Sequence, residues 1–189
     1  MAAIGSQLVV HVRAGYNVAN YFSYFTNLSN LVAAAVMLAS AARPRAAGPD
    51  RARGAAATYL VIVGLVYAAL LRGLPLGDLR PWVNAALHVV TPVGVALEWA
   101  TRPADSRIGA ATVVRWLAFP ALFLVYTLAR GAAVGWYPYP FLNPATAGGY
   151  AGVGAYVVGI VGVFALVAWA VAGLANRRAR TRQLAAAER

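Results

Sequence analysis

The chain contains 189 residues, of which 61% are hydrophobic, and carries a formal net charge of +11 at neutral pH. A soluble domain is about half apolar, so this composition excludes an ordinary soluble domain. The chain has no cysteine, which excludes disulfides, thiolate chemistry and cysteine-based metal sites. Its basic residues lie in short segments between apolar runs, where membrane insertion places them, so the charge does not indicate a nucleic-acid partner.

Apolar runs of about twenty residues, the length that crosses a hydrocarbon core, recur along the chain. They predict an all-α fold, a polytopic transmembrane helix bundle. Residues 1–20 are interrupted by Gln7 and His11, so we expect a short or truncated N-terminal helix that either lies along the interface or continues a longer helix. Five full spans are expected at residues 22–42, 56–74, 82–100, 113–134 and 150–175. The bundle thus covers residues 21–175, and a basic tail of residues 176–189 follows it.

Arginine is concentrated in three segments that alternating spans place on one side of the membrane. These segments contain Arg43, Arg45, Arg51 and Arg53, then Arg102 and Arg107, and finally Arg177, Arg178, Arg180 and Arg182. Since cytoplasmic loops carry an excess of positive charge, we expect this side and the C-terminus to be cytoplasmic, in a multi-pass protein of the cell membrane. Anionic lipid headgroups are sufficient partners for such a tail, so membrane lipids are the expected partners.

Two polar side chains fall at a similar predicted depth below the outer face. Thr26 is four residues into the first span and His88 is six residues into the third, or roughly 6 and 9 Å at 1.5 Å per residue. A hydroxyl and an imidazole together are sufficient for nucleophilic catalysis. Each also has a structural alternative, because a Thr hydroxyl bonds to the carbonyl four residues earlier and a membrane His can join two helices.

Three asparagines accompany this pair. Asn30 shares a helix face with Thr26, and Asn27 lies alongside, so this polar stripe should face the bundle interior. Asn84 is one turn before His88 and is a candidate for orienting the imidazole. All three amides are candidates for stabilising an oxyanion.

The fourth span and the segment after it hold further candidates. Arg130, at the same predicted depth, is a candidate for binding a substrate carboxylate, with Tyr126 one turn away as a phenolic donor. The alternative for Arg130 is snorkelling to the headgroups. The aromatic segment at residues 136–141 fits either an interfacial belt or a lid or wall against an acyl chain.

A metal site has little support in the sequence. The chain has no HxxxH or HxxE pair, and His11 is the only histidine besides His88. Glu98 should lie near the opposite face, where we expect it to pair with Arg102 or Arg115. No metal and no other cofactor is expected.

Three segments resemble a known family: FSYFTNLSN at 22–30, LHVVTP at 87–92 and YTLARGAAVGWYPYPFLNP at 126–144. They resemble a family of bacterial integral membrane proteins with six helices. That family is similar in turn to the eukaryotic androgen-induced and androgen-dependent membrane proteins, which hydrolyse fatty acid esters of hydroxy fatty acids with an intramembrane Thr nucleophile and a His. The resemblance implies that Thr26 is the nucleophile and His88 its base.

The main functional hypothesis is therefore an intramembrane threonine hydrolase of lipid esters, with the substrate reaching the site sideways between helices. The rival is a non-catalytic lipid-binding or regulatory membrane protein in which Thr26, Asn30 and His88 only join helices. A transporter is a weaker third hypothesis, because it should show more intramembrane charge or paired broken helices.

Overall fold

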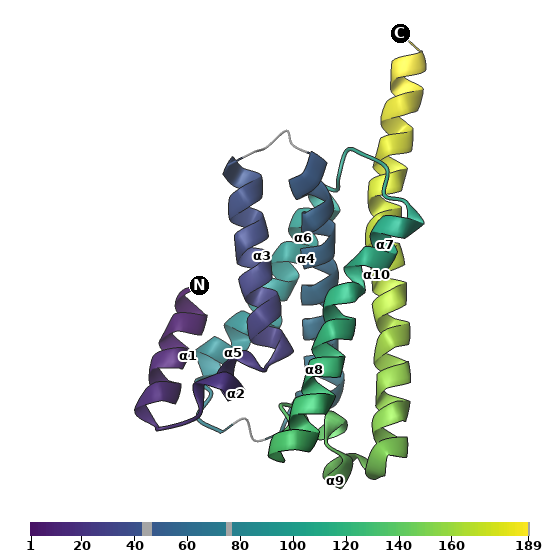
Figure 1. Cartoon of the computed structure of the whole chain (residues 1–189). Coiled ribbons are helices and arrows are strands. Elements are labelled where there is room, and N and C mark those ends of the chain that lie inside the picture. The colour runs from purple at the N-terminus through teal and green to yellow at the C-terminus, as the bar shows by residue number, and fades with distance from the viewer. Residues whose placement is uncertain (43–46, 75–76, 189) are drawn as a thin grey trace.

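The computed structural model describes residues 1–42, 47–74 and 77–188. Within these ranges every regular element is a helix, which confirms the predicted all-α class. Five helical segments are long and apolar enough to cross a membrane, as in a multi-pass membrane protein. They run side by side and alternate in direction (Figure 1). Their bounds are Phe25–Ala42, Asp50–Leu71, Pro81–Thr101, Ala110–Val134 and Gly149–Ala187.

Most of these spans contain more than one helical element. The first is α3 (Phe25–Ala42) alone, and the last is α10 (Gly149–Ala187) alone. The second joins α4 (Ala47–Val66) to the π-turn η1 (Tyr67–Leu71). The third consists of α5 (Pro81–Ala85), the π-turn η2 (Ala86–Val90) and α6 (Thr91–Thr101). The fourth joins α7 (Ala110–Trp116) to α8 (Ala118–Val134). The short η3 (Pro140–Leu142) and α9 (Pro144–Ala147) lie between α8 and α10.

The first span begins three residues later than the sequence predicts. Asn17 caps a separate short helix, α2 (Val18–Phe22), by accepting a hydrogen bond from the backbone N–H of Ala19 at 2.8 Å. The chain turns at Ser23, and α3 then starts at Phe25. Thr26 consequently lies in the first turn of α3 and not one turn inside a longer helix.

α4 occupies the centre of the bundle. It packs against α3, α6 and α10, and half of its span is buried, compared with 11% of the α7–α8 span. A Cβ at Gly54 would lie 2.6 Å from the Trp116 ring, so only glycine fits the present packing there. Because α4 packs against both α3 and α6, it fixes these two helices relative to each other. Its buried residues include Ala56, Ala57, Thr58, Tyr59, Leu60, Ile62 and Val63.

The charged end of α4 corrects one sequence-based expectation. Glu98 pairs with Arg53, with 2.5 Å between Oε1 and Nη2, and not with Arg102 or Arg115 as expected. Arg53 also contacts Asp50 at 2.8 Å. The reason is the antiparallel packing of α4 and α6, which brings the start of one helix beside the end of the other. Arg43 and Arg45, which the topology prediction included, lie outside the described residues.

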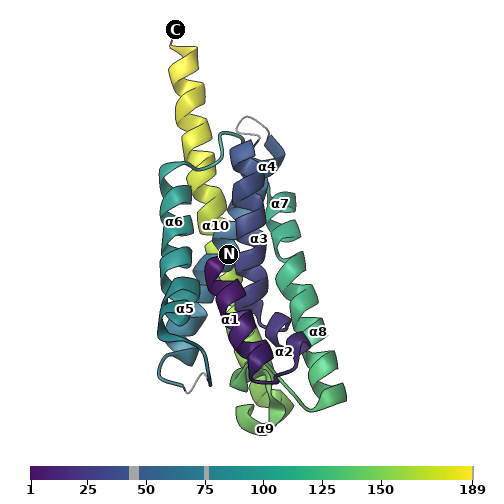
Figure 2. The same ribbon diagram turned by 90° about the vertical axis from the view of Figure 1, so that its left-hand side faces the viewer.

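The two ends of the chain are helical. α1 (Ala2–Arg13) buries Ala3, Ile4 and Gln7 and lies along the bundle beside α5 (Figure 2). α10 continues as one helix through the expected basic tail to Ala187 and projects beyond the other spans (Figure 1). Asp105 anchors this extension through ion pairs with Arg178 at 3.3 Å and Arg182 at 2.6 Å.

Candidate functional site

The structure brings Thr26 and His88 together. Thr26 Oγ1 lies 3.2 Å from His88 Nε2, and both residues are buried, with exposed fractions of 6% and 8%. Their contact joins the first turn of α3 to the π-turn η2, 62 positions apart in the chain. This distance lies within the range over which an alcohol can pass its proton to a base as the two groups approach.

The second ring nitrogen of His88 decides which partner donates. His88 Nδ1 lies 3.2 Å from the backbone carbonyl oxygen of Asn84. A carbonyl only accepts, so Nδ1 carries the hydrogen and Nε2 presents its lone pair to Thr26. The Thr26 hydroxyl is therefore the donor in the pair. This is the polarity that a general base requires, because the imidazole is ready to accept the hydroxyl proton.

The imidazole is also held in its plane. The Tyr67 ring stacks on it with 4.5 Å between ring centroids and 24° between planes. The Tyr67 hydroxyl accepts a hydrogen bond from Asn84 Nδ2 at 2.7 Å. Asn84 thus orients His88 twice, directly through its carbonyl and indirectly through Tyr67. The sequence pattern indicated Asn84 as an orienting residue, whereas nothing in it pointed to Tyr67.

The position of Thr26 in the first turn of α3 gives it an electropositive surrounding. The first N–H groups of a helix lack acceptors inside the helix, and the helix dipole is positive at this end. The Thr26 N–H instead points to the hydroxyl of Tyr139, with 3.4 Å between N and O. An oxygen that gains negative charge beside Thr26 therefore meets hydrogen-bond donors.

Tyr139 is a site residue that the sequence analysis did not identify. It comes from the segment between α8 and α10, and its ring is 8% exposed and stacks on Phe141 with centroids 5.1 Å apart. Burial raises the pKa of Tyr139 to about 12, partly offset by its hydrogen bonds with Thr26, so the phenol keeps its proton at neutral pH. The only sequence signal is the aromatic, proline-rich 136–141 segment, which fits an interfacial belt as well as a lid or wall.

Asn27 and Asn30 bind backbone carbonyls. Asn27 Nδ2 donates to the carbonyl of Tyr21 at 2.8 Å and ties α2 to α3. Asn30 Nδ2 donates to the carbonyls of Thr26 at 2.9 Å and Leu87 at 3.3 Å, so it holds the α3 turn beside η2. These bonds position the Thr26–His88 pair. The expected role of these amides at an oxyanion stays a prediction.

Arg130 and Tyr126 form a separate contact between α8 and α2. Arg130 Nη2 donates to Asn20 Oδ1 at 2.6 Å, and its guanidinium carbon lies 5.2 Å from the centroid of the Trp136 ring. The Tyr126 hydroxyl lies 2.8 Å from Ser23 Oγ. Neither side chain lines the cavity at Thr26. Their assignment to substrate binding stays a prediction.

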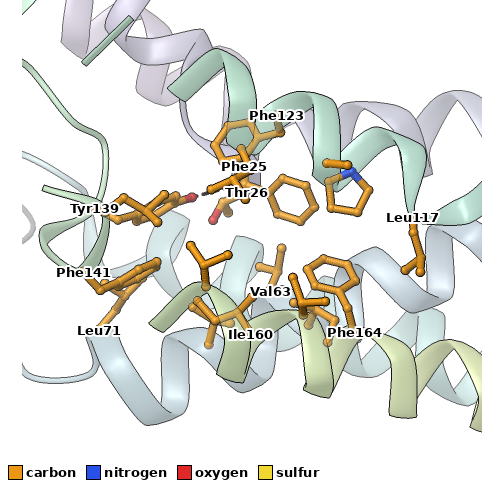
Figure 3. Close-up of a pocket in the computed structure, with 18 residues that line it drawn as sticks. Phe25, Thr26, Val63, Leu71, Leu117, Phe123, Tyr139, Phe141, Ile160 and Phe164 are labelled. Carbon is orange, nitrogen blue, oxygen red and sulfur yellow. Dashed lines mark hydrogen bonds between the residues drawn. The ribbon is translucent and has the colours of Figure 1, made fainter. Parts of the chain in front are cut away.

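A cavity of about 210 Å³ opens beside Thr26. Residues of α4, α8 and α10 form its walls, and Phe141 of η3 lies at the end that holds Tyr139 (Figure 3). Among its lining residues only Thr26 and Tyr139 have polar side-chain atoms. His88 is not in the lining: it contacts Thr26 but not the cavity. The nucleophile candidate therefore stands between a base and an apolar chamber.

In the part of the chain that the structure describes, no three His, Asp or Glu side chains are grouped so that they could hold a metal ion. Compared with protein-family models, with curated proteins and with solved structures, the chain has no match.

Proposed function

We propose that the protein is an intramembrane hydrolase that cleaves the ester bonds of lipids with Thr26 as nucleophile and His88 as general base. The observation that carries this proposal is the 3.2 Å contact between the Thr26 hydroxyl and His88 Nε2 at the polar end of an apolar cavity. A buried alcohol, a correctly oriented imidazole and space for a hydrocarbon are what such a reaction needs.

The reaction follows from the polarity of the hydrogen bonds. His88 Nε2 accepts the Thr26 proton while Oγ1 forms a bond to the ester carbonyl carbon. The tetrahedral intermediate then breaks its bond to the alcohol, which leaves with the proton from His88. Water gives a proton to His88 and attacks the acyl-threonine. The second intermediate collapses to the free fatty acid, and His88 returns the proton to Thr26.

Tyr139 and the start of α3 provide the electrostatic part of the mechanism. The carbonyl oxygen becomes negatively charged in each tetrahedral intermediate and needs donors already in place. The Tyr139 hydroxyl and the Thr26 N–H lie 3.4 Å apart on the cavity side of the nucleophile. An oxyanion beside this pair could accept from the Tyr139 hydroxyl and from the Thr26 N–H, which would then leave the Tyr139 oxygen.

The dyad differs from a serine triad in what stands behind the histidine. In a triad an aspartate accepts the Nδ1 hydrogen and stabilises the imidazolium. Here the neutral Asn84 carbonyl accepts it at 3.2 Å. A carbonyl fixes the tautomer but stabilises the imidazolium less than a carboxylate does, so we expect slow turnover.

We further propose that the site lies below the outer leaflet of the cell membrane, with the C-terminus in the cytoplasm. Arginines of the described residues support this orientation, because nine lie at the end where α3, α6 and α10 finish and four lie toward the other end. The nine are Arg51, Arg53, Arg102, Arg107, Arg115, Arg177, Arg178, Arg180 and Arg182, and the four are Arg13, Arg72, Arg80 and Arg130. The resemblance of residues 22–30, 87–92 and 126–144 to the bacterial membrane family, which is similar in turn to the androgen-induced proteins through Thr26 and His88, agrees with the same function.

The second candidate is a non-catalytic lipid-binding protein. One observation favours it: the Thr26–His88 contact is also an ordinary hydrogen bond between two helices, and the cavity would suit a lipid tail without any reaction. The two functions make opposite predictions for turnover.

The test is hydrolysis of fatty acid esters of hydroxy fatty acids by the purified full chain in detergent or nanodiscs. We expect release of free fatty acid by the wild type, none by Thr26→Ala or His88→Gln, and partial activity of Thr26→Ser. Thr127→Ala is a matched control, because Thr127 is also buried in a span but its hydroxyl has no partner among the described residues. A wild type that is folded yet inert to these esters and to fluorophosphonate probes would favour the lipid-binding protein.

A further inference from the structure

We infer that the cavity beside Thr26 binds one acyl chain of a membrane ester, with the ester carbonyl at Thr26 and Tyr139, and that the chain reaches it through an opening between α8 and α10. The identity of the polar group rests on the proposed function, whereas the place and direction of the hydrocarbon rest on the cavity itself.

The distribution of polar atoms sets the direction of the ligand. The two lining side chains with polar atoms, Thr26 and Tyr139, meet at one end of the cavity. Every other lining side chain is aliphatic, aromatic or proline. A ligand that satisfies such a cavity has a single polar group at one end and a hydrocarbon behind it, which is the pattern of a fatty acyl group.

The length of the cavity limits how much hydrocarbon it takes. Figure 3 shows Leu117 and Phe164 at the end opposite Tyr139. The lining runs from residue 117 to 124 beside α8 and from 157 to 164 on α10, or roughly 10 Å along each helix at 1.5 Å per residue. An extended hydrocarbon chain lengthens by about 1.25 Å per carbon, because each carbon–carbon bond of about 1.52 Å is inclined to the chain axis. A cavity of this length therefore holds about eight carbons. Longer chains must continue through the opening into the bilayer.

The opening lies on the side of the bundle. Ala121 of α8 and Val161 of α10 line the cavity and are also exposed on the outside of the bundle. The α7–α8 span is the least buried of the five, at 11%. This part of the surface lies in the middle of two apolar spans, so in a membrane it faces lipid chains. A lipid tail can therefore pass from the bilayer to Thr26 without crossing water.

The chain offers a selective way to close this opening, because it contains no cysteine. Ala121→Cys or Val161→Cys, modified with N-ethylmaleimide, would place a bulky group in the opening. Leu122→Cys and Val158→Cys are matched controls, since both residues are neighbours on the same helices, are exposed by 70% and 74%, and do not line the cavity.

The probe is a fatty acid with a photoreactive diazirine, used with the purified full chain. We expect a diazirine beside the carboxyl group to label the segment with Tyr139 and Phe141, and one near the eighth carbon to label residues around Leu117 and Phe164. Treating the Ala121→Cys or the Val161→Cys variant with N-ethylmaleimide should reduce labelling by about tenfold, because the added group overfills the opening. The modified controls should label like the wild type.

Two results would overturn the inference: labelling spread over all spans, or equal labelling after the opening and the control positions are modified. Labelling is measured on the wild type and on the four cysteine variants, because the probe is a free fatty acid with no ester bond to cleave, and hydrolysis is measured separately on the wild type. Labelling as expected with an inert wild type would therefore reject the hydrolase and retain the acyl site. If the wild type hydrolyses the esters but modification of the opening does not change labelling, the hydrolase is retained and the acyl site with its side opening is rejected.

Discussion

Tyr139→Phe separates catalysis from folding at this site. The substitution keeps the ring, its stacking on Phe141 and its contact with Tyr24, and removes only the hydroxyl. The lost contact with the Thr26 N–H is long, at 3.4 Å, so we expect the free energy of unfolding to fall by only about 1 kcal/mol. The loss of an oxyanion donor lowers kcat by about 10²–10³, or about 2.7–4 kcal/mol of transition-state stabilisation.

The assay is ester hydrolysis over a range of substrate concentrations up to saturation, with thermal unfolding measured on the same preparations. We expect kcat to fall while KM stays nearly constant, because the hydroxyl acts mainly when the oxyanion forms. Tyr24→Phe is the control, since it removes a phenol hydroxyl from the ring that packs 5.9 Å from Tyr139. If Tyr139→Phe keeps kcat within a factor of about three of the wild type, Tyr139 is not an oxyanion donor.

Three further predictions concern stability. Asn30→Ala should lower the free energy of unfolding by about 1–3 kcal/mol, because it removes donors to two buried carbonyls; thermal melts of this variant check the loss. Arg53→Met should destabilise the protein more than Glu98→Gln does, because it leaves a partly buried carboxylate without its partner; chemical unfolding of both variants gives the order. The free energy of unfolding should fall as the pH rises from 10 to 12. The pKa of Tyr139 is raised from 10.0 in the unfolded chain to about 12 in the folded one. The unfolded chain therefore loses this proton first, and the free energy of unfolding, unaffected below pH 10, falls by about 3 kcal/mol across this interval. Tyr139→Phe should remove this part of the pH dependence, and unchanged alkaline unfolding in that variant would contradict the assignment.

The spans can be predicted because a bilayer requires helices of a certain length and apolar composition, and both can be recognised directly in the sequence. Thr26 and His88 could be matched for the same reason. Both lie near the same end of spans that run in one direction, and a polar side chain in a span tends to face the interior. Their depth can therefore be read from the sequence, while the packing of α3, α4 and α6 turns them toward each other.

Other features depend on tertiary contacts that have no local pattern. Tyr139 reaches Thr26 from the segment between α8 and α10, 113 positions away in the chain, and one tyrosine among several aromatic neighbours does not reveal this contact. Glu98 pairs with Arg53 because α4 and α6 are antiparallel, a partner 45 positions away in the chain. The break at Ser23 was partly visible, since Asn17 has the side chain of a helix cap. It was missed because the apolar run continues through it.

The side opening of the cavity has a kinetic consequence. A substrate that arrives through the bilayer is diluted by other lipids and not by water. The turnover of a lipid ester should therefore follow its mole fraction in the membrane, and adding inert phospholipid at constant bulk concentration should slow the reaction. The free fatty acid would leave in the same way, so that product accumulating in one leaflet competes with fresh substrate.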